Sequence, residues 1–199
     1  MNGMKVCYSL VCLCVVIPMV SATAAVVYVD KDNVSGLEDG TSWATAFTTL
    51  QPAMDAANYN DAVWIAEGLY DEARTGQGYG GLIVKGTLHV FGGFTGTETS
   101  VGQRDLAHHE TIIDGSKAYN GQAAPRVVWT NDTIELDGLT IQGGRALGSG
   151  NITSCGGLAA YSVRDDQGNL LPSAGVFIRN CTFRDNLAYE RCAPLGVLS

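Results

Sequence analysis

The feature of this sequence that most restricts its fold is an internal repeat in the second half of the chain. Residues 136–146 (LDGLTIQGGRA) align with residues 178–188 (IRNCTFRDNLA). Apolar positions coincide in the two segments, and Thr140 coincides with Thr182. An offset of this size, from Leu136 to Ile178, is typical of architectures in which similar units stack on one another. The sequence therefore predicts a stacked fold in which the repeat is one long unit or two shorter ones.

Short apolar runs separated by glycine or asparagine fill the chain from residue 81 onward. Each run has about five residues or fewer, which suits a single β-strand. The runs lie at residues 82–84, 88–91, 111–114, 127–130, 134–136, 139–141, 158–161, 176–178 and 181–183. No helical period separates them, which argues against strand–helix–strand crossovers. The run at 158–161 lies midway between the two repeats and favours two units of about twenty residues each.

The residues between the runs predict sharp corners, because glycine and asparagine tolerate the left-handed backbone conformation. A chain that turns a corner after every few strand residues stacks each unit on the previous one, with parallel strands about 4.8 Å apart. The predicted fold class is therefore all-β, a solenoid of parallel strands.

Residues 25–80 are predicted to form the first strands and a short helical cap. The runs at 25–29 and 61–66 predict strands, and apolar residues recur at helical spacing between residues 49 and 58. We expect this helix to cover the N-terminal end of the solenoid. The large apolar side chains expected in the core of the cap are Trp43, Phe47, Leu50, Met54 and Trp64.

Residues 1–24 are predicted to be an export signal. Lys5 precedes a nearly unbroken apolar run from Val6 to Val20, and Ala22-Thr23-Ala24 has the small-x-small pattern of a cleavage site. The run is shorter than the roughly 20 residues with which a helix spans a bilayer, so a cleaved signal is favoured over a retained anchor. We expect cleavage after Ala24, a secreted or surface-exposed product, and no transmembrane helix after signal removal.

Cys155, Cys181 and Cys192 remain once the predicted signal is removed. Export permits disulfides, but three is an odd number and no metal-type CxxC spacing is present. The sequence leaves the pairing of the three thiols open. Cys181 lies in an apolar strand pattern and is predicted to be a buried free thiol.

Nucleic acids and nucleotides are excluded as partners. The chain carries 20 acidic and 12 basic residues, a net charge of −8, whereas a nucleic-acid binder needs a basic face. Residues 76–81 satisfy the pattern GxGxxG, but a dinucleotide site needs a strand before it and a helix after it. Here a polar stretch precedes the pattern and the strand-like run at 82–84 follows, so a loop is predicted.

Several blocks of this chain, taken in order, resemble one family of repeat proteins. The blocks are residues 28–30, 39–44, 50–58, 63–70, 91–99, 103–105, 111–115 and 136–141. They are similar to those of the secreted bacterial right-handed parallel β-helix proteins of the pectin-lyase-like superfamily, above all those with polymorphic outer membrane protein-type repeats. The Gly-Gly-aliphatic and Phe-x-x-Asn elements of that repeat resemble residues 156–158 and 183–186. The resemblance covers about residues 26–188 and implies a right-handed parallel β-helix with an N-terminal capping helix.

The chain departs from the family pattern at three places. Residues 141–144 stand where Phe-x-x-Asn is expected, and residues 163–173 lengthen one unit as a surface loop. After residue 188 the pattern stops with no further unit, so we expect a chain truncated at its C-terminal end. The expected division is a signal at 1–24, a cap with the first strands at 25–80, and parallel β-helix at 81–199.

The resemblance implies two alternative functions. The first is a non-enzymatic secreted or cell-surface protein with a structural, adhesive or glycan-contacting role, whose partner is an extracellular polysaccharide or a surface molecule. The alternative is a polysaccharide lyase or glycoside hydrolase acting on acidic polysaccharide, and only this alternative implies a cofactor, calcium. Lyase chemistry needs a basic residue beside several carboxylates. The candidates are Asp114, Lys117, Asp132, Asp137 and Arg145.

These candidates are scattered singly along the sequence, so no catalytic residue is assigned and exposed structural charges are favoured. His108-His109-Glu110 offers metal-ligand side chains, but HExxH is absent and a loop before the strand at 111–114 is predicted. Asp165-Asp166 lies in the expected surface loop and is predicted to be solvated. The sequence thus favours the non-enzymatic role and predicts no metal or cofactor for it.

Overall fold

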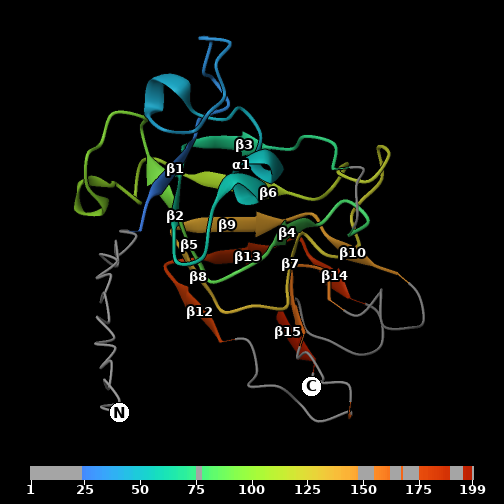
Figure 1. Ribbon diagram of the computed structural model, residues 1–199. Helices are drawn as coiled ribbons and strands as arrows, with labels where there is room; N and C mark the ends of the chain where they lie inside the picture. The colour runs from blue at the N-terminus through green and yellow to red at the C-terminus, as the bar shows by residue number, and fades with distance from the viewer. Residues whose placement is uncertain are drawn as a thin grey trace, which may run out of the picture.

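The computed structural model describes residues 24–74, 78–147, 155–161, 167, 175–188 and 195–198 (Figure 1). Nearly all of the predicted signal, most of the predicted loop at 163–173, and Cys192 lie outside these residues. The described chain is mainly β-structure, and the named strands pair only in parallel. The all-β fold class is therefore confirmed.

Three parallel sheets hold most of the strands. Sheet A contains β1 (Val26–Val29), β2 (Ala62–Ala66), β5 (Leu88–Phe94), β8 (Ile134–Asp137) and β12 (Val176–Arg179) in that order. Sheet B contains β3 (Gly68–Tyr70), β6 (Thr111–Asp114), β9 (Leu139–Gln142) and β13 (Thr182–Arg184). Sheet C contains β4 (Leu82–Val84), β7 (Val128–Thr130), β11 (Leu158–Tyr161) and β15 (Leu195–Leu198). A separate pair joins β10 (Arg145–Ala146) to β14 (Leu187–Ala188).

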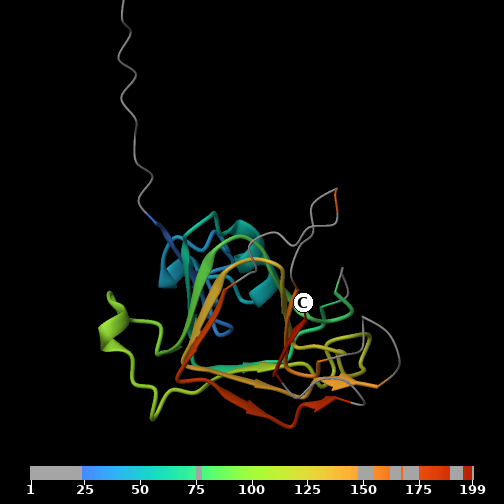
Figure 2. The same ribbon diagram turned by 90° about the horizontal axis from the view of Figure 1, so that it is seen from below.

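The chain visits sheets A, B and C in the same order each time, and one such circuit is here called a pass. Successive passes contain β2–β3–β4, β5–β6–β7, β8–β9–β11 and β12–β13–β15. Seen end-on, the three sheets form three sides around the core (Figure 2). Strands of the segment 25–80 belong to the same sheets as the later strands.

The sequence repeat is one complete pass, so the interpretation as two shorter units is wrong. Ile134 in β8 pairs with Val176 in β12, and Thr140 in β9 pairs with Thr182 in β13, each at the offset that separates the two repeats. The run at 158–161 is β11, the sheet C strand of the same pass. The strands β8, β9 and β11 are spaced far enough apart in the sequence that their one pass looked like two units.

The length of a pass varies because the loops vary. Ala62 pairs with His89, whereas Leu88 pairs with Ile134, so the second of these passes is much longer than the first. Parallel pairing tolerates this variation, since loops at the corners grow without disturbing the strand registers. A fixed sequence period is therefore visible only between the last two passes.

Most predicted elements are confirmed, and the errors are local. Helix α1 spans Leu50–Ala56 within the predicted 49–58, and short 3₁₀ turns occupy Trp43–Thr45 and Val101–Gln103. Strand β3 was not predicted, since the glycine at its start resembled a turn. Strand β5 has seven residues and its pairing with β2 contains an irregularity. Strand β15 was also not predicted; it pairs with β11 and completes the pass that contains β12 and β13.

Side chains that point inward stack in columns along the passes. Leu136, Leu139 and Ile141 are buried as predicted. Their counterparts in the last described pass, Ile178, Cys181 and Phe183, are only partly buried against the same core. Burying each such side chain is worth about 1.5–3 kcal/mol, so the columns provide much of the driving force for stacking.

Two cysteines lie among the described residues. Cys155 is buried. Cys181 is a free thiol, as predicted, although it is half-buried rather than fully buried. Burial raises the pKa of the Cys181 thiol, which keeps it protonated at neutral pH.

Helix α1 closes the first pass on the side of sheet C. Leu50, Ala53 and Met54 contribute to the core. The Gln51 side chain donates a hydrogen bond to the Ile83 carbonyl (3.1 Å) and accepts one from the Ile83 amide (2.9 Å). One amide side chain thus pairs with the open edge of β4 as a neighbouring strand would, which removes an exposed strand edge.

Trp43 and Trp64 do not form the core of this cap, contrary to the prediction. Trp64 stacks on Phe94 (ring centroids 4.7 Å apart), and Trp43 contacts Tyr28 (4.8 Å) and Phe94 (5.6 Å). Val63 and Ile65, on either side of Trp64, belong to the core. Because side chains alternate along a strand, Trp64 faces the outside of sheet A, and Trp43 covers it there.

The close approach of Gly144 and Gly156 gives the first testable prediction. A Cβ at Gly144 would lie 1.6 Å from the Gly156 oxygen, so we expect Gly144→Ala to reduce the free energy of unfolding by about 3 kcal/mol. Gly102→Ala is the matched control, because nothing lies within 4 Å of its Cβ position, and a change within about 0.5 kcal/mol is expected. Urea unfolding followed by tryptophan fluorescence measures both, and equal stability of the two variants would contradict the packing described here.

Candidate functional site

A groove lies between α1, the segment after β3, and the outer side of β4. Its volume is about 510 Å³. The groove is lined by Thr49, Gln51, Pro52, Asp55, Glu72, Ala73, Arg74, Gly81, Ile83 and Lys85. Two acidic and two basic residues therefore line the groove together with the apolar residues Pro52, Ala73 and Ile83. A concave, partly apolar surface with a few polar groups is the usual form of a small-molecule or saccharide site.

Arg74 and Glu72 fix one wall of the groove. The Arg74 side chain is buried and donates to the carbonyl oxygens of Gly80 (Nε, 2.9 Å) and Asp114 (Nη2, 2.8 Å). Its Nη1 lies 3.3 Å from Glu72 Oε1, which also accepts the first amide of α1, from Leu50, at 3.2 Å. Burial lowers the pKa of Arg74, and the Glu72 carboxylate partly offsets that effect. The positive charge of Arg74 is thus neutralised inside the protein.

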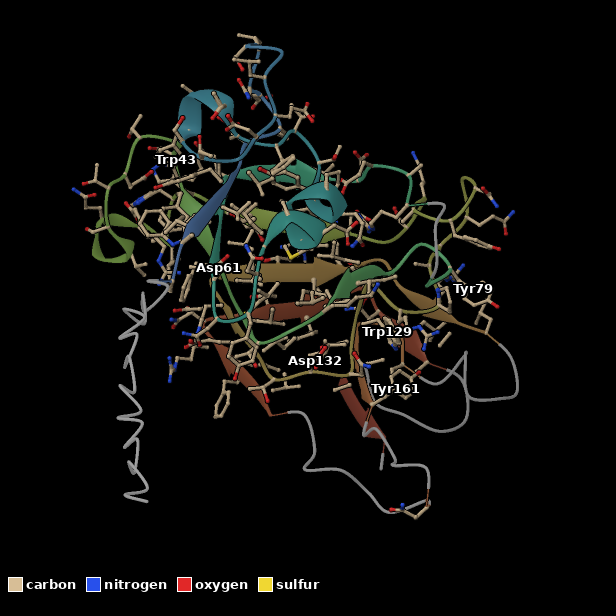
Figure 3. All side chains as sticks on the ribbon, in the orientation of Figure 1. Trp43, Asp61, Tyr79, Trp129, Asp132 and Tyr161 are labelled. Atoms are coloured by element: carbon tan, nitrogen blue, oxygen red, sulfur yellow. The ribbon has the colours of Figure 1, made fainter. Side chains whose placement is uncertain are left out.

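Aromatic side chains continue this surface across sheet C. Trp129 in β7 is in register with Ile83 in β4, which lines the groove, and with Ala159 in β11. Val128 and Thr130 are buried, whereas Trp129 is partly exposed, so Trp129 points outward. The Trp129 and Tyr161 ring centroids lie 6.2 Å apart, and Figure 3 labels both residues. Ala159, in register with Trp129, is fully buried, so the exposed part of this surface is formed by the two rings themselves.

Arg126 supports the two aromatic rings. Its guanidinium carbon lies 5.9 Å from the Trp129 centroid and 5.4 Å from the Tyr161 centroid, and Nη1 donates to the Tyr161 hydroxyl. Arg126 is buried, so cation–π contact and hydrogen bonding hold the rings in place without exposing the charge. We call the groove together with Arg126, Trp129 and Tyr161 the sheet C face.

The outer side of sheet A presents a second set of side chains. Glu135 in β8 accepts from His89 Nδ1 (2.8 Å) and pairs with Arg179 of β12. Phe177, in register with Glu135, is 56% exposed. A smaller hollow of about 230 Å³ lies among these residues. The charged groups on this face neutralise one another, so a variant on this face can serve as a control for variants on the sheet C face.

Three of the five lyase candidates lie around the end of sheet B. Asp114 ends β6, where it accepts from Gln142 Nε2 (2.7 Å) and the Ser116 amide (2.6 Å). Burial alone would raise the pKa of Asp114, but these hydrogen bonds lower it below its ordinary value. Lys117 is exposed in the turn that follows, and Arg145 is exposed in β10. Both carboxylate oxygens of Asp114 thus accept hydrogen bonds from within the fold.

The other two candidates lie at different corners. Asp132, between β7 and β8, accepts from the Gly86 amide (2.8 Å). Asp137 ends β8, where it forms an ion pair with Arg104 (2.9 Å) and accepts from Asn180 Nδ2 (2.8 Å). Both carboxylates therefore hold neighbouring passes together, and the five candidates do not form one cluster.

The remaining sequence motifs are loops where the structure describes them. His108 and His109 lie in the turn before β6, as predicted, and pair with Asp105 (2.7 Å) and Glu67 (2.9 Å). Gly78–Gly81 of the glycine motif precede β4, while residues 76 and 77, and Asp165-Asp166, lie outside the described residues. Within the described part of the chain, no three His, Cys, Asp or Glu side chains gather as a metal site.

The sequence did not reveal the sheet C face. The run at 127–130 was recognised as a strand, and its alternation already placed Trp129 opposite to Val128. Tyr161, however, comes much later in the chain, and only the register of β7 with β11 brings the two rings together. Comparison of the chain with protein-family models, curated proteins and solved structures finds no match. None of the described helices is long and apolar enough to span a membrane.

The pair of His109 and Glu67 gives a second prediction. The hydrogen bond to Glu67 raises the pKa of His109 above its ordinary value of 6.5. Any stability from this pair is therefore fully present below pH 6.5 and is lost as the pH rises through the raised value. In an NMR titration, Glu67→Gln should return the His109 midpoint toward 6.5, whereas Glu110→Gln should leave it unchanged. An unaltered midpoint in Glu67→Gln would show that the pair does not form.

Proposed function

We propose that this chain is an exported right-handed parallel β-helix protein that acts at the cell surface or outside the cell and binds an extracellular polysaccharide without cleaving it. The sheet C face is the proposed binding surface. Its partners are hydroxyl-rich, uncharged sugar chains.

The order of the strands supports the proposed fold. The chain passes from sheet A to B to C four times, and each strand pairs in parallel with the strand one pass away. Right-handed connections between parallel strands are strongly preferred, which supports the proposed handedness. The apolar run and cleavage pattern in residues 1–24 support export.

The observation that carries the proposed function is the continuity of the groove with an aromatic platform. Ile83 lines the groove and is in register with Trp129, whose ring lies beside Tyr161. Aromatic rings offer flat apolar surface to the C–H faces of sugars, while nearby polar side chains bind hydroxyl groups. Because β4, β7 and β11 are stacked in one sheet, the platform and groove are held on a rigid support.

The charges favour an uncharged ligand over an acidic one. The groove carries Asp55 and Glu72 against Arg74 and Lys85, so its formal charges balance. Arg74 is already paired with Glu72, and the chain as a whole has a net charge of −8. A polyanion would therefore approach against the overall field with little local compensation.

Substitution of Trp129 is the direct test of the proposed function. Removing the larger ring of the platform should weaken binding of a neutral polysaccharide by about tenfold or more, as loss of a central aromatic contact usually does. Affinity gel electrophoresis of Trp129→Ala, with glucan, xylan or mannan in the gel, measures the change. The same gels with a uronate polymer should show little retardation.

The matched control is Phe177→Ala, which removes an exposed aromatic ring from sheet A and should leave retardation unchanged. Thermal unfolding of both variants separates loss of binding from loss of fold. Equal retardation of wild type and Trp129→Ala would overturn the proposed binding surface. Release of unsaturated products from a uronate polymer would instead establish the lyase alternative.

A further inference from the structure

Asp61 is a buried carboxylate in the turn before β2, and its side chain reaches the start of β1. Only 5% of the surface of Asp61 is exposed. Oδ1 accepts the Ala25 amide at 2.7 Å, and Oδ2 accepts the Asn58 amide at 2.8 Å. Figure 3 shows Asp61 beside the first strand. Among the described residues, no cationic side chain lies within salt-bridge distance of it.

A buried carboxylate without a counter-ion is costly, since burial penalises the charged form. The nitrogen that donates to Asp61 Oδ1 is a backbone nitrogen, that of Ala25. This nitrogen is also the one that the cleavage pattern Ala22-Thr23-Ala24 would release. Both Ala24 and Ala25 are exposed, so the bond between them is accessible.

We infer that the bond between Ala24 and Ala25 is a processing site and that Asp61 binds the α-ammonium group that cleavage creates. The inference rests on the proposed export of the chain. A signal peptidase hydrolyses the peptide bond with one water molecule, leaving a carboxylate on Ala24 and an amine on Ala25, which is protonated at neutral pH. The amide–carboxylate hydrogen bond at 2.7 Å becomes a partly buried ion pair.

The ion pair fixes the first strand of sheet A. The Ala25 carbonyl already accepts the Ala62 amide (2.9 Å), and the next residue, Val26, is in register with Ala62. A terminus one residue longer would move the ammonium group by about 3.3 Å along the strand, away from Asp61. Cleavage therefore completes the fold only when it occurs after Ala24.

The experiment begins with the full-length chain, exported and purified from a host with a signal peptidase. Intact mass and N-terminal sequencing should give Ala25 as the first residue. The α-amino group is then acetylated selectively at about pH 6.5, where its lower pKa leaves a larger unprotonated fraction than that of the lysine side chains; acetylation removes its charge but keeps one N–H donor. We expect acetylation to lower the melting temperature by roughly 5–10 °C, because it leaves a buried carboxylate without a counter-ion.

Asp61→Asn is the matched background, since it keeps the shape of the side chain and removes its charge. In that variant acetylation should change the melting temperature by less than about 2 °C, because the ion pair is already absent. If Asp61→Asn does not fold, the acetylation shift of the unsubstituted chain decides alone. A shift below about 2 °C there, equal shifts in both backgrounds, or a first residue other than Ala25 would overturn the inference.

Glycan binding distinguishes this inference from the proposed function. Acetylated and Asp61→Asn proteins that remain folded should bind polysaccharide as wild type does, because Asp61 does not line the groove. Loss of binding in Trp129→Ala together with the expected acetylation shift would support both. No binding by wild type, together with the expected shift, would reject only the proposed ligand.

Discussion

Parallel backbone pairing between successive passes is the constraint on which the rest of this structure depends. Each strand satisfies its amide and carbonyl groups with the strand one pass away, so a residue in one pass fixes its neighbour in the next. The registers then align apolar side chains into columns in the core. Between strands the chain must either turn sharply or form a loop. Sharp turns bring backbone segments close together, as at Gly144 and Gly156.

In the first pass no earlier pass pairs with the strands, so their outer edges need another part of the chain to cover them. Different segments cover the edges in sheet C and in sheet A. Gln51 pairs with the β4 edge on sheet C. On sheet A, β1 covers the edge of β2, and a bridge from Phe47 to Val29 covers part of the edge of β1. Asp61 ties the beginning of β1 to the turn before β2. Closure of this end thus depends on a few polar side chains as much as on the apolar face of α1.

The sequence predicted local structure well because local signals are strong in this chain. Short apolar runs predicted eleven of the fifteen named strands, all but β3, β10, β14 and β15, and helical spacing predicted α1 to within one or two residues at each end. Spatial relations were harder, because loops of unequal length obscure the period, so one pass was divided into two units. The pairing of Trp129 with Tyr161 and the contact of Asp61 with Ala25 both depend on strand registers. The sequence around Trp129 or around Asp61 does not by itself indicate which residue each of them contacts.

The central claim is that one pass spans the whole of the sequence repeat and brings each strand beside the strand one pass away. Methyl–methyl nuclear Overhauser contacts test it directly, because Leu136 is in register with both Val90 and Ile178. Contacts from the Leu136 methyl groups to both residues are the predicted result. Contacts from Leu136 to a sheet neighbour about twenty residues away, with none to Ile178, would contradict the three-sided arrangement and the proposed binding face that depends on it.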